Sequence, residues 1–473
     1  SRCSATGKGE PMFKRILIAN RGEIAVRIIR ACREMGIQSV AVYSEADRDS
    51  LHTLLADEAI CIGPAPSTKS YLNMEQILAA TVAMGAEAIH PGFGFLSENA
   101  KFAELCAKCN IAFIGPSAEI IHRMGNKSEA RKTMMEAGVP VVPGSKTPVY
   151  TVEEARKMAE EIGYPVMIKA SSGGGGKGMR VSWGEDDFAM NFESAQLESI
   201  KGFSDNTMYL ERYVEKPRHV EFQIMADKYG NVVHLGERDC SIQRRHQKVL
   251  EESPSVAISD ELRRKMGETA VRAAKAVGYE NAGTIEFLLD KNRNFYFMEM
   301  NTRIQVEHGV TELVTGVDLV RQQLRIASGL ALRLRQEDVT LQGHAIECRI
   351  NAEDPVQGFR PCPGRVDFLH FPGGPGVRVD SCLYSGCELS PYYDSMAAKI
   401  LAYAPTRMET IRRMRRCLEE FTLEGFPTNA ELSYQILYHP EFILGECTTA
   451  FLDEHLSELL EFSRKLSESG VDA

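Results

Sequence analysis

The residues best suited to chemistry lie in one apolar stretch, 295–301, and in the polar positions that follow it. Glu299 and Asn301 are two residues apart, and alternate side chains of an extended strand share one face. Their oxygens would therefore point at the same place, as the ligands of one metal ion must. The same spacing continues through Arg303, Gln305 and Glu307. The pattern indicates a reactive site rather than a packed core.

A neighbouring apolar run, 284–289, contains one more carboxylate, Glu286. A four-residue hairpin loop at 291–294 would pair Asp290 with Phe295, and that register places Glu286 opposite Glu299. Two like charges directly opposite each other destabilise a sheet unless something neutralises them. Hard oxygen ligands of this kind suit Mg²⁺ or Mn²⁺ shared with substrate phosphates. The alternative is a solvated hairpin face with incidental acids, which the apolar flanking residues disfavour.

Four consecutive glycines, 173–176, precede Lys177 and Gly178. Glycine lets the backbone approach a ligand closely, and successive N–H groups can hold phosphate oxygens. The stretch matches G-x-G-x-x-G, but residues 179–183 predict a strand where a Rossmann loop would enter a helix. It also fails the Walker A pattern at Ser171 and Gly178. What remains is a hairpin lid over nucleotide phosphates with Lys169 on the incoming strand; the alternative is a mobile turn beside an ordinary lysine.

The rest of the chain predicts an α/β scaffold for these residues. Apolar runs at 15–19, 39–43, 86–89 and 112–114, with a helical pattern at 23–35, indicate a parallel sheet covered by helices. Thr151 and Glu154 form a capping box that opens a helix to about residue 162, and Ser259 caps another that ends at Gly278. We predict four segments: a Rossmann-like domain at 12–114, a linker at 115–141, a glycine-loop lid at 142–213 and a larger C-terminal α+β part at 214–457.

Composition narrows the class of protein. The chain has 473 residues, of which 44% are hydrophobic and 25% charged, as expected for a globular protein of two to four domains. The net charge of -10 argues against a nucleic-acid surface. No apolar run is long enough to span a bilayer, and residues 1–11 lack the hydrophobic stretch of a signal peptide. Only Cys106 and Cys109 form C-x-x-C, so we expect reduced thiols and a cytoplasmic location.

Five motifs, in this order, resemble those of the ATP-grasp superfamily and, within it, of the biotin carboxylase family. They are Asn20-Arg-Gly-Glu-Ile-Ala25, His90-Pro-Gly-Phe-Gly-Phe-Leu-Ser-Glu98, the glycine loop, Arg238 through Lys248 and Glu299 through His308. The resemblance covers residues 16 to about 455. Residues 348–354 and 371–374 look most like the biotin carboxylase subunit of bacterial acetyl-CoA carboxylase. The implied architecture is three-domain ATP-grasp, with an N-terminal Rossmann-like parallel sheet, a small glycine-loop lid domain and a larger C-terminal α+β domain.

The resemblance also implies a role for each candidate residue. ATP would be bound by Lys127, Lys169, Gly174, Gly175, Gly176, Glu211, His219, Gln243 and His246. The metal, one or two ions of Mg²⁺ or Mn²⁺, would be held by Glu286, Glu299 and Asn301. Bicarbonate and biotin would be positioned by Lys248, Arg303, Gln305, Val306, Glu307 and Arg349. Among these the catalytic residues would be Lys248, Arg303, Glu307 as the base that deprotonates bicarbonate, and Arg349, which would stabilise the biotin enolate.

The implied reaction is the ATP- and bicarbonate-dependent carboxylation of biotin through carboxyphosphate, as the first half-reaction of acetyl-CoA carboxylase. The alternative acceptor is that of a pyruvate or other acyl-CoA carboxylase. Because the sequence has no Met-Lys-Met attachment motif, we expect biotin on a separate biotin carboxyl carrier protein, with carboxyltransferase subunits as further partners. A homodimer is expected from the resemblance alone. Neither nucleic acid nor a membrane is an expected partner.

One departure from the family pattern concerns Gly309, which follows His308 where the family commonly has proline. Because glycine frees the backbone, we expect Glu307 to be held less rigidly. Two other classes of function stay open. One is an ATP-grasp ligase that joins a carboxylate to an amine or thiol through an acyl phosphate. The other is a nonenzymatic ATP-binding module, which the intact set of Glu307, Arg303 and Arg349 disfavours.

Overall fold

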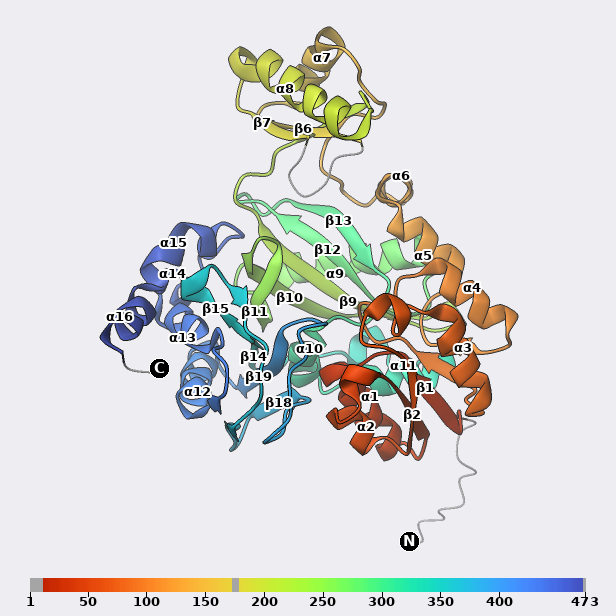
Figure 1. Ribbon diagram of the computed structural model, residues 1–473. Coiled ribbons are helices and arrows are strands. Elements are labelled where there is room, and N and C mark those ends of the chain that lie inside the picture. Colours follow the sequence, from red (N-terminus) through yellow and green to blue (C-terminus); the bar gives the residue numbers. More distant parts are fainter. Residues whose placement is uncertain (1–11, 172–177, 471–473) are drawn as a thin grey trace. The chain divides into compact units, whose positions relative to one another are not determined.

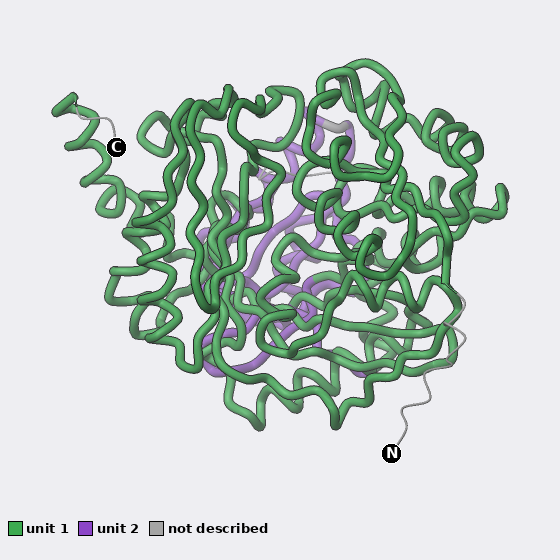
Figure 2. Tube along the Cα trace, turned by 90° about the horizontal axis from the view of Figure 1, so that it is seen from below, with its two compact units in different colours: residues 1–137, 218–286, 299–473 green, residues 138–217, 287–298 purple. Residues whose placement is uncertain are grey.

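The computed structural model describes residues 12–171 and 178–470 (Figure 1). The predicted phosphate-binding residues Gly174, Gly175 and Gly176 lie outside the described residues. The chain forms two compact units, which Figure 2 distinguishes: unit 1 contains residues 1–137, 218–286 and 299–473, and unit 2 contains 138–217 and 287–298. Among the described residues, no helix has both the length and the apolar character needed to cross a bilayer.

Unit 1 begins with the predicted parallel sheet. Its strands run in the order β3 (Glu58–Gly63), β2 (Gln38–Ser44), β1 (Arg15–Ile18), β4 (Ala88–His90) and β5 (Ala112–Phe113), all paired in parallel. The helices of this region are α1 (Gly22–Glu34), α2 (Leu51–Leu55), α3 (Met74–Ala83), α4 (Ala100–Lys108), α5 (Ala118–Gly125) and α6 (Lys127–Glu136). Ile16 packs with residues of α1, and Leu17 packs with residues of α3 and α4. Apolar residues therefore fill both faces of β1, as expected of a helix-covered parallel sheet.

An eight-stranded sheet organises the second half of the chain. Its order is β13 (Phe295–Asn301), β12 (Asn281–Leu289), β9 (Arg218–Ala226), β10 (Val232–Arg244), β11 (Gln247–Ser253), β14 (His344–Asn351), β19 (Met396–Ala404) and β18 (Val377–Ser381). From β9 to β18 neighbouring strands are antiparallel. The short strands are β15 (Glu353–Asp354), β16 (Arg360–Pro361), β17 (Phe368–His370) and β20 (Thr422–Glu424). The helices are α9 (Asp260–Ala276), α10 (His308–Thr315), α11 (Leu319–Ala327), α12 (Arg407–Glu420), α13 (Ala430–Tyr438), α14 (Pro440–Ile443), α15 (Phe451–Leu459) and α16 (Glu461–Ser469).

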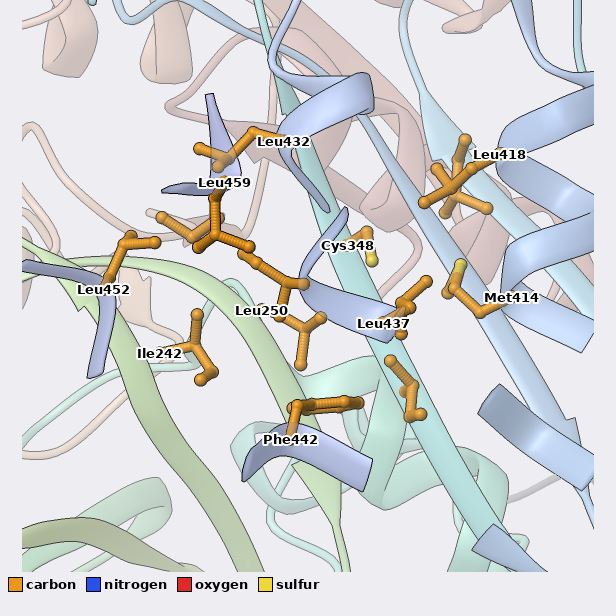
Figure 3. Close-up of a cluster of buried hydrophobic side chains, with 14 of the residues drawn as sticks. Ile242, Leu250, Cys348, Met414, Leu418, Leu432, Leu437, Phe442, Leu452 and Leu459 are labelled. Atoms are coloured by element: carbon orange, nitrogen blue, oxygen red, sulfur yellow. The ribbon is translucent and has the colours of Figure 1, made fainter. Parts of the chain in front are cut away.

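One face of this sheet is apolar and carries the core drawn in Figure 3. Leu250, Cys348 and Ile400 are cross-strand neighbours on β11, β14 and β19, and they pack against helix residues such as Met414 and Leu437. Because successive strand residues point to opposite faces, the residues between them point away from this core. Charged residues among these neighbours are Glu251, Glu347, Arg349 and Lys399.

Unit 2 has a sheet of its own, in the order β7 (Met179–Ser182), β6 (Val166–Ala170) and β8 (Met208–Arg212), with helices α7 (Val152–Ile162) and α8 (Glu185–Phe203). The strands predicted on either side of the glycine loop are thereby confirmed. Thr151 caps α7 by accepting the N–H of Glu154 at 3.3 Å. The reciprocal half of the predicted capping box is wrong, since the Glu154 carboxylate accepts the N–H of Tyr150 instead, at 3.5 Å.

The predicted pairing of Asp290 with Phe295 is also wrong. The N–H of Asp290 donates to the carbonyl of Asn294 at 2.9 Å, and the N–H of Arg293 donates to the carbonyl of Asp290 at 3.0 Å. The loop is thus one residue shorter than predicted, with Arg293 at φ +64°, as in hairpins that close with a bulge. The Asp290 carboxylate stabilises this turn because it accepts the N–H groups of Asn292 and Asn294. The turn alone therefore does not set Glu286 opposite Glu299.

Candidate functional site

A cavity of about 590 Å³ in unit 1 is lined by all four predicted catalytic residues. Seven of the predicted site residues line it: His246, Lys248, Arg303, Gln305, Val306, Glu307 and Arg349. They come from the β10–β11 hairpin, the segment after β13, and β14. These three segments are far apart in the sequence. The cavity therefore forms only when the fold brings them together. Tyr392 and Tyr393 also line the cavity, and no pattern in the sequence pointed to them.

Glu307 is the carboxylate best placed for proton transfer in this cavity. It is the residue that precedes α10 and is 1% exposed. Its Oε1 lies 2.6 Å from Nζ of Lys248, and its Oε2 lies 3.0 Å from Nη2 of Arg349. Charged hydrogen bonds of this length are strong and directional. Two cations therefore hold the carboxylate in one orientation.

Lys248 links Glu307 to a second group of acids. Its Nζ donates to Glu221 at 2.9 Å and lies 3.4 Å from Glu286. Burial lowers the pKa of Lys248, but the charges of Glu221, Glu307 and Glu286 outweigh that effect and raise the pKa well above its ordinary value. The ammonium group is thus fully charged at neutral pH.

Three buried residues, His219, Glu221 and Glu286, form a compact set of potential metal ligands. Their ligand atoms all lie within 4.8 Å of one another. Nε2 of His219 is 3.4 Å from Glu221 and 3.7 Å from Glu286, and no described residue forms a hydrogen bond with it. Burial raises the pKa of Glu286 to about 7, with smaller raising contributions from Glu221 and Glu299. Glu299 lies on β13, two residues before Asn301.

The donor set of this cluster fits a divalent cation. Asn301 lies on β13 and donates from its side-chain amide to Glu286 at 2.6 Å, so it too belongs to the cluster. Carboxylate and amide oxygens are the ligands that Mg²⁺ and Mn²⁺ prefer. A cation among these acids would also offset the burial and the smaller repulsion that together raise the pKa of Glu286. Glu221 was not predicted from the sequence. Its position was nevertheless a signal, because His219, Glu221 and Gln223 occupy alternate positions of β9.

The remaining cavity residues are tied to this centre by hydrogen bonds. Gln305 donates to Glu286 at 3.4 Å and accepts from Nη1 of Arg303 at 2.9 Å. Nε of Arg303 also donates to Glu98, of the second family-like motif, at 2.6 Å. The carbonyl of Val306 accepts a hydrogen bond from the buried Lys399 at 2.6 Å. The chain from 303 to 307 is therefore held at both side chains and backbone.

Besides Lys248, two predicted residues lie in the β10–β11 hairpin. Gln243 contacts Nδ1 of His219 at 3.0 Å, so it lies against the acidic cluster. His246 is exposed, with φ +64°, at the second position of the two-residue turn between Arg244 and Gln247. Cys240 on the same strand lies 3.8 Å from Glu307, and burial raises the pKa of its thiol well above the ordinary value. The thiol is thus protonated at neutral pH and is not a nucleophile.

Of the predicted ATP-binding residues that the structure describes, only His246 lines the cavity. His219 and Gln243 lie at the acidic cluster, and the other three lie elsewhere. Lys127 is the first residue of α6 in unit 1. Lys169 and Glu211 belong to β6 and β8 of unit 2, where they form an ion pair of 2.6 Å. Both side chains are about one-third exposed, so this pair contributes little to stability. A nucleotide would give these charges a further role.

Gly309, the departure noted above, has a packing reason. It is the second residue of α10, and a Cβ atom there would lie 2.7 Å from Cδ2 of Leu401. Leu401 is fully buried and packs with Val310 and Val314. The close approach of α10 to β19 therefore favours glycine here.

Three family models match this chain. Residues 12–121 match the family model "Biotin carboxylase, N-terminal domain", 126–335 match "Carbamoyl-phosphate synthase L chain, ATP binding domain", and 347–454 match "Biotin carboxylase C-terminal domain". The chain is 58% identical to a biotin carboxylase of a Nostoc species, over 93% of this chain and 99% of the relative. It is 54% identical to a pyruvate carboxylase subunit of Methanothermobacter thermautotrophicus, over 94% of this chain and 90% of the relative.

A solved structure is similar over nearly the whole length. It is the biotin carboxylase domain dimer of Hydrogenobacter thermophilus 2-oxoglutarate carboxylase, in complex with MgADP, ADP and bicarbonate. The TM-score is 0.86 at 50% identity, over 95% of this chain and 99% of the other. The predicted ATP-grasp fold is confirmed by this match. The chain therefore belongs to the biotin carboxylase family and is an ATP-dependent enzyme of that family.

Proposed function

We propose that this chain carboxylates biotin held on a separate carrier protein, using ATP and bicarbonate, as the first half-reaction of acetyl-CoA carboxylase. One observation carries the proposal: a buried carboxylate, Glu307, is fixed between Lys248 and Arg349 in a cavity next to an acidic cluster that suits a divalent cation. That arrangement combines a base, two anion-binding groups and a metal site, which are the groups that activation of bicarbonate by ATP requires.

In this proposal Glu307 takes the bicarbonate proton as the bicarbonate oxygen attacks the γ-phosphorus of ATP, which releases ADP and forms carboxyphosphate. General-base catalysis of this kind is worth ~10²–10⁴-fold. Lys248, Arg303, Gln305 and the backbone at Val306 orient the anion so that attack starts from a productive geometry. Carboxyphosphate then breaks down to CO₂ and phosphate, the phosphate removes the ureido proton of biotin, and the enolate attacks CO₂. Arg349 stabilises the negative charge on that enolate.

The acidic cluster would hold the metal. We propose Glu286, Glu299 and Asn301 as ligands of one or two ions of Mg²⁺ or Mn²⁺, and Glu221 as a neighbouring charge that also secures Lys248. When bound, the cation would neutralise charge on the transferred phosphoryl group. Glu286 is well suited to this role because burial, with a smaller contribution from the neighbouring acids, disfavours its charged form in the absence of a cation.

The proposed ATP-binding residues are those that the sequence predicted. We propose Lys127, His219, Gln243 and His246 in unit 1, and Lys169 and Glu211 in unit 2, together with the glycines at 174–176. We also propose the functional division predicted from the sequence: residues 12–114, 115–141, 142–213 and 214–457. The H. thermophilus relative crystallised with MgADP and bicarbonate, which supports the choice of nucleotide, metal and anion.

We propose a biotin carboxyl carrier protein and carboxyltransferase subunits as partners, a homodimer as the working form and a cytoplasmic location. The dimer named for the H. thermophilus domain supports the homodimer. Relatives named for pyruvate and 2-oxoglutarate carboxylases make a keto acid the alternative final acceptor. The resemblance of residues 348–354 and 371–374 to acetyl-CoA carboxylase subunits favours acetyl-CoA.

The decisive experiment measures ADP release with bicarbonate, in the presence and absence of free biotin, and follows label from ¹⁴C-bicarbonate into biotin. Stimulation by biotin together with labelled carboxybiotin is the expected result. ATP hydrolysis that depends on an amino acid and ignores biotin would instead indicate a different ATP-grasp ligase. Adding purified carrier protein and then acetyl-CoA or pyruvate with the matching carboxyltransferase would identify the acceptor.

A further inference from the structure

Four charged residues form a ladder across three strands behind the cavity. Glu251 on β11 is the cross-strand neighbour of Glu347 on β14, and Arg349 on β14 is the cross-strand neighbour of Lys399 on β19. Glu347 and Arg349 are two residues apart, so all four side chains share the face opposite the apolar core. Glu251, Glu347 and Lys399 are each 0% exposed. Of the four, only Arg349 was predicted from the sequence.

Glu251 is the residue that orients Arg349. Its Oε1 accepts a hydrogen bond from Nε of Arg349 at 2.6 Å, while Nη2 of the same guanidinium reaches Glu307. The Arg349 side chain is 16% exposed, so its tip meets the cavity while its Nε is held from behind. Fixing Nε fixes the plane of the whole guanidinium, because the group is rigid and planar. The direction of Arg349 thus depends on the direction of Glu251.

Glu347 has no donor of its own among the described residues. Both of its carboxyl oxygens are buried without a hydrogen-bond partner, and so is Oε2 of Glu251. Directly opposed side chains in an antiparallel pair are close enough to touch, and two ionised carboxylates there would repel. Lys399 does not resolve this, because its ammonium group is bound to the carbonyl of Val306 and to Glu23 at 3.1 Å. A single proton between the two carboxyl groups would join Oε2 of Glu251 to one of the two orphaned oxygens of Glu347.

The proton belongs on Glu347. Burial raises the pKa of Glu347 well above its ordinary value, and the charge of Glu251 raises it further, which outweighs the lowering by Lys399 and Arg349. Burial also raises the pKa of Glu251, but the charge of Arg349, whose Nε lies 2.6 Å away, lowers it. Glu251 is therefore the carboxylate and Glu347 the acid.

We propose that Glu347 is a positioning residue, a neutral carboxylic acid that donates a hydrogen bond to Glu251 and so holds Glu251, and through it Arg349, in the direction needed at the cavity. The inference rests on the proposed function, in which Arg349 stabilises the biotin enolate. Without this donor Glu251 is free to rotate, and Arg349 loses the partner that fixes its plane. A misplacement of the catalytic group by about 1 Å can cost roughly 10²-fold in rate.

Two substitutions of similar size separate this role from packing. Glu347→Gln keeps a neutral donor at the same place, whereas Glu347→Leu keeps only the volume. We expect Glu347→Leu to lower kcat of biotin carboxylation by roughly 10- to 100-fold with KM for ATP within about twofold, and Glu347→Gln to keep most of kcat. A purely structural role predicts the reverse order, because an apolar side chain replaces a buried polar group well. Equal activity of the two variants, or a more active leucine variant, overturns the proposal.

Two further measurements test the pathway of the effect. In an Arg349→Ala background, Glu347→Leu and Glu347→Gln should have equal kcat, since both act through the missing guanidinium; a remaining difference overturns the proposal. Infrared spectra of the wild type at neutral pH should contain the C=O stretch of a protonated carboxyl group, and spectra of Glu347→Gln should lack this band. If the wild type also lacks the band, the proposal is overturned. If biotin does not stimulate ATP hydrolysis by the wild type, the proposed function itself is refuted. If the wild type and the Glu347→Leu variant are both fully active, only the role of Glu347 is refuted.

Discussion

Glu307→Gln tests the centre of the mechanism. Glutamine keeps the shape of the side chain and one oxygen acceptor, but it cannot take a proton from bicarbonate, and its NH₂ group must face either Lys248 or Arg349. Loss of a general base costs ~10²–10⁴-fold, which corresponds to about 3–5 kcal/mol of activation free energy. We therefore expect bicarbonate- and biotin-dependent ATP turnover to fall by at least about 10²-fold. KM for ATP should change little, because the substitution leaves the proposed ATP-binding residues intact.

The same substitution should leave the protein folded. Lys248 keeps its hydrogen bond to Glu221 at 2.9 Å, and Arg349 keeps its bond to Glu251 at 2.6 Å. Neither cation is left unpaired, so the loss of stability should stay near about 1–3 kcal/mol, the range for one hydrogen bond to a charged group. Urea denaturation followed by tryptophan fluorescence or circular dichroism measures this change.

A matched control is Glu252→Gln, one residue along the same strand from Glu251. Glu252 is also buried and also pairs with an arginine, Arg407 at 2.8 Å, and with His344 at 2.6 Å, but it does not line the cavity. Its loss should lower stability by a similar or larger amount while kcat of the folded protein stays within about threefold. The assay is ADP release at saturating ATP, with biotin and bicarbonate varied. If Glu307→Gln retained more than a tenth of wild-type kcat, or if the control lost as much, the assignment of Glu307 as the base would be refuted.

Three further substitutions have expected outcomes. Glu286→Gln should raise the Mg²⁺ concentration for half-maximal ATP turnover by about tenfold or more, since it removes a charged ligand; an unchanged Mg²⁺ dependence would contradict the proposed cluster. Burial lowers the pKa of His90 to about 4, and its Nδ1 accepts the N–H of Gly92. The neutral form of His90 is the one that fits the fold, so the free energy of unfolding should be highest above pH 6.5 and should fall by about 3 kcal/mol as the pH drops toward 4. His90→Gln should make the free energy of unfolding less dependent on pH in this range. An unaltered slope between those pH values would contradict this prediction. Gly309→Ala should destabilise by about 1 kcal/mol or more through contact with Leu401, and Leu401→Val should reduce that cost in the double variant if the contact is the cause.

The local pattern of the sequence determined the elements. Apolar runs with period two and period near 3.6 placed β1, α1, β2 and the strands around the glycine loop, because such patterns depend only on neighbouring residues. The apolar run that contains Glu299 and Asn301 likewise predicted the strand β13. Long motifs in a fixed order identified the family and, through it, made Glu307 and Arg349 candidates.

Only the tertiary structure decided which strands lie next to each other. The hairpin at 290–294 closed one residue earlier than predicted, because Asp290 accepts two N–H groups within the loop and Arg293 adopts a left-handed conformation. The same dependence on strand neighbours explains why four charged residues were not predicted from the sequence: Glu221, Glu251, Glu347 and Lys399. Each is an ordinary charged residue in its own strand, and its role arises from the cross-strand order β11-β14-β19 and from burial. Sequence spacing records which face a side chain points to, whereas the charge it meets there depends on strands far away in the chain.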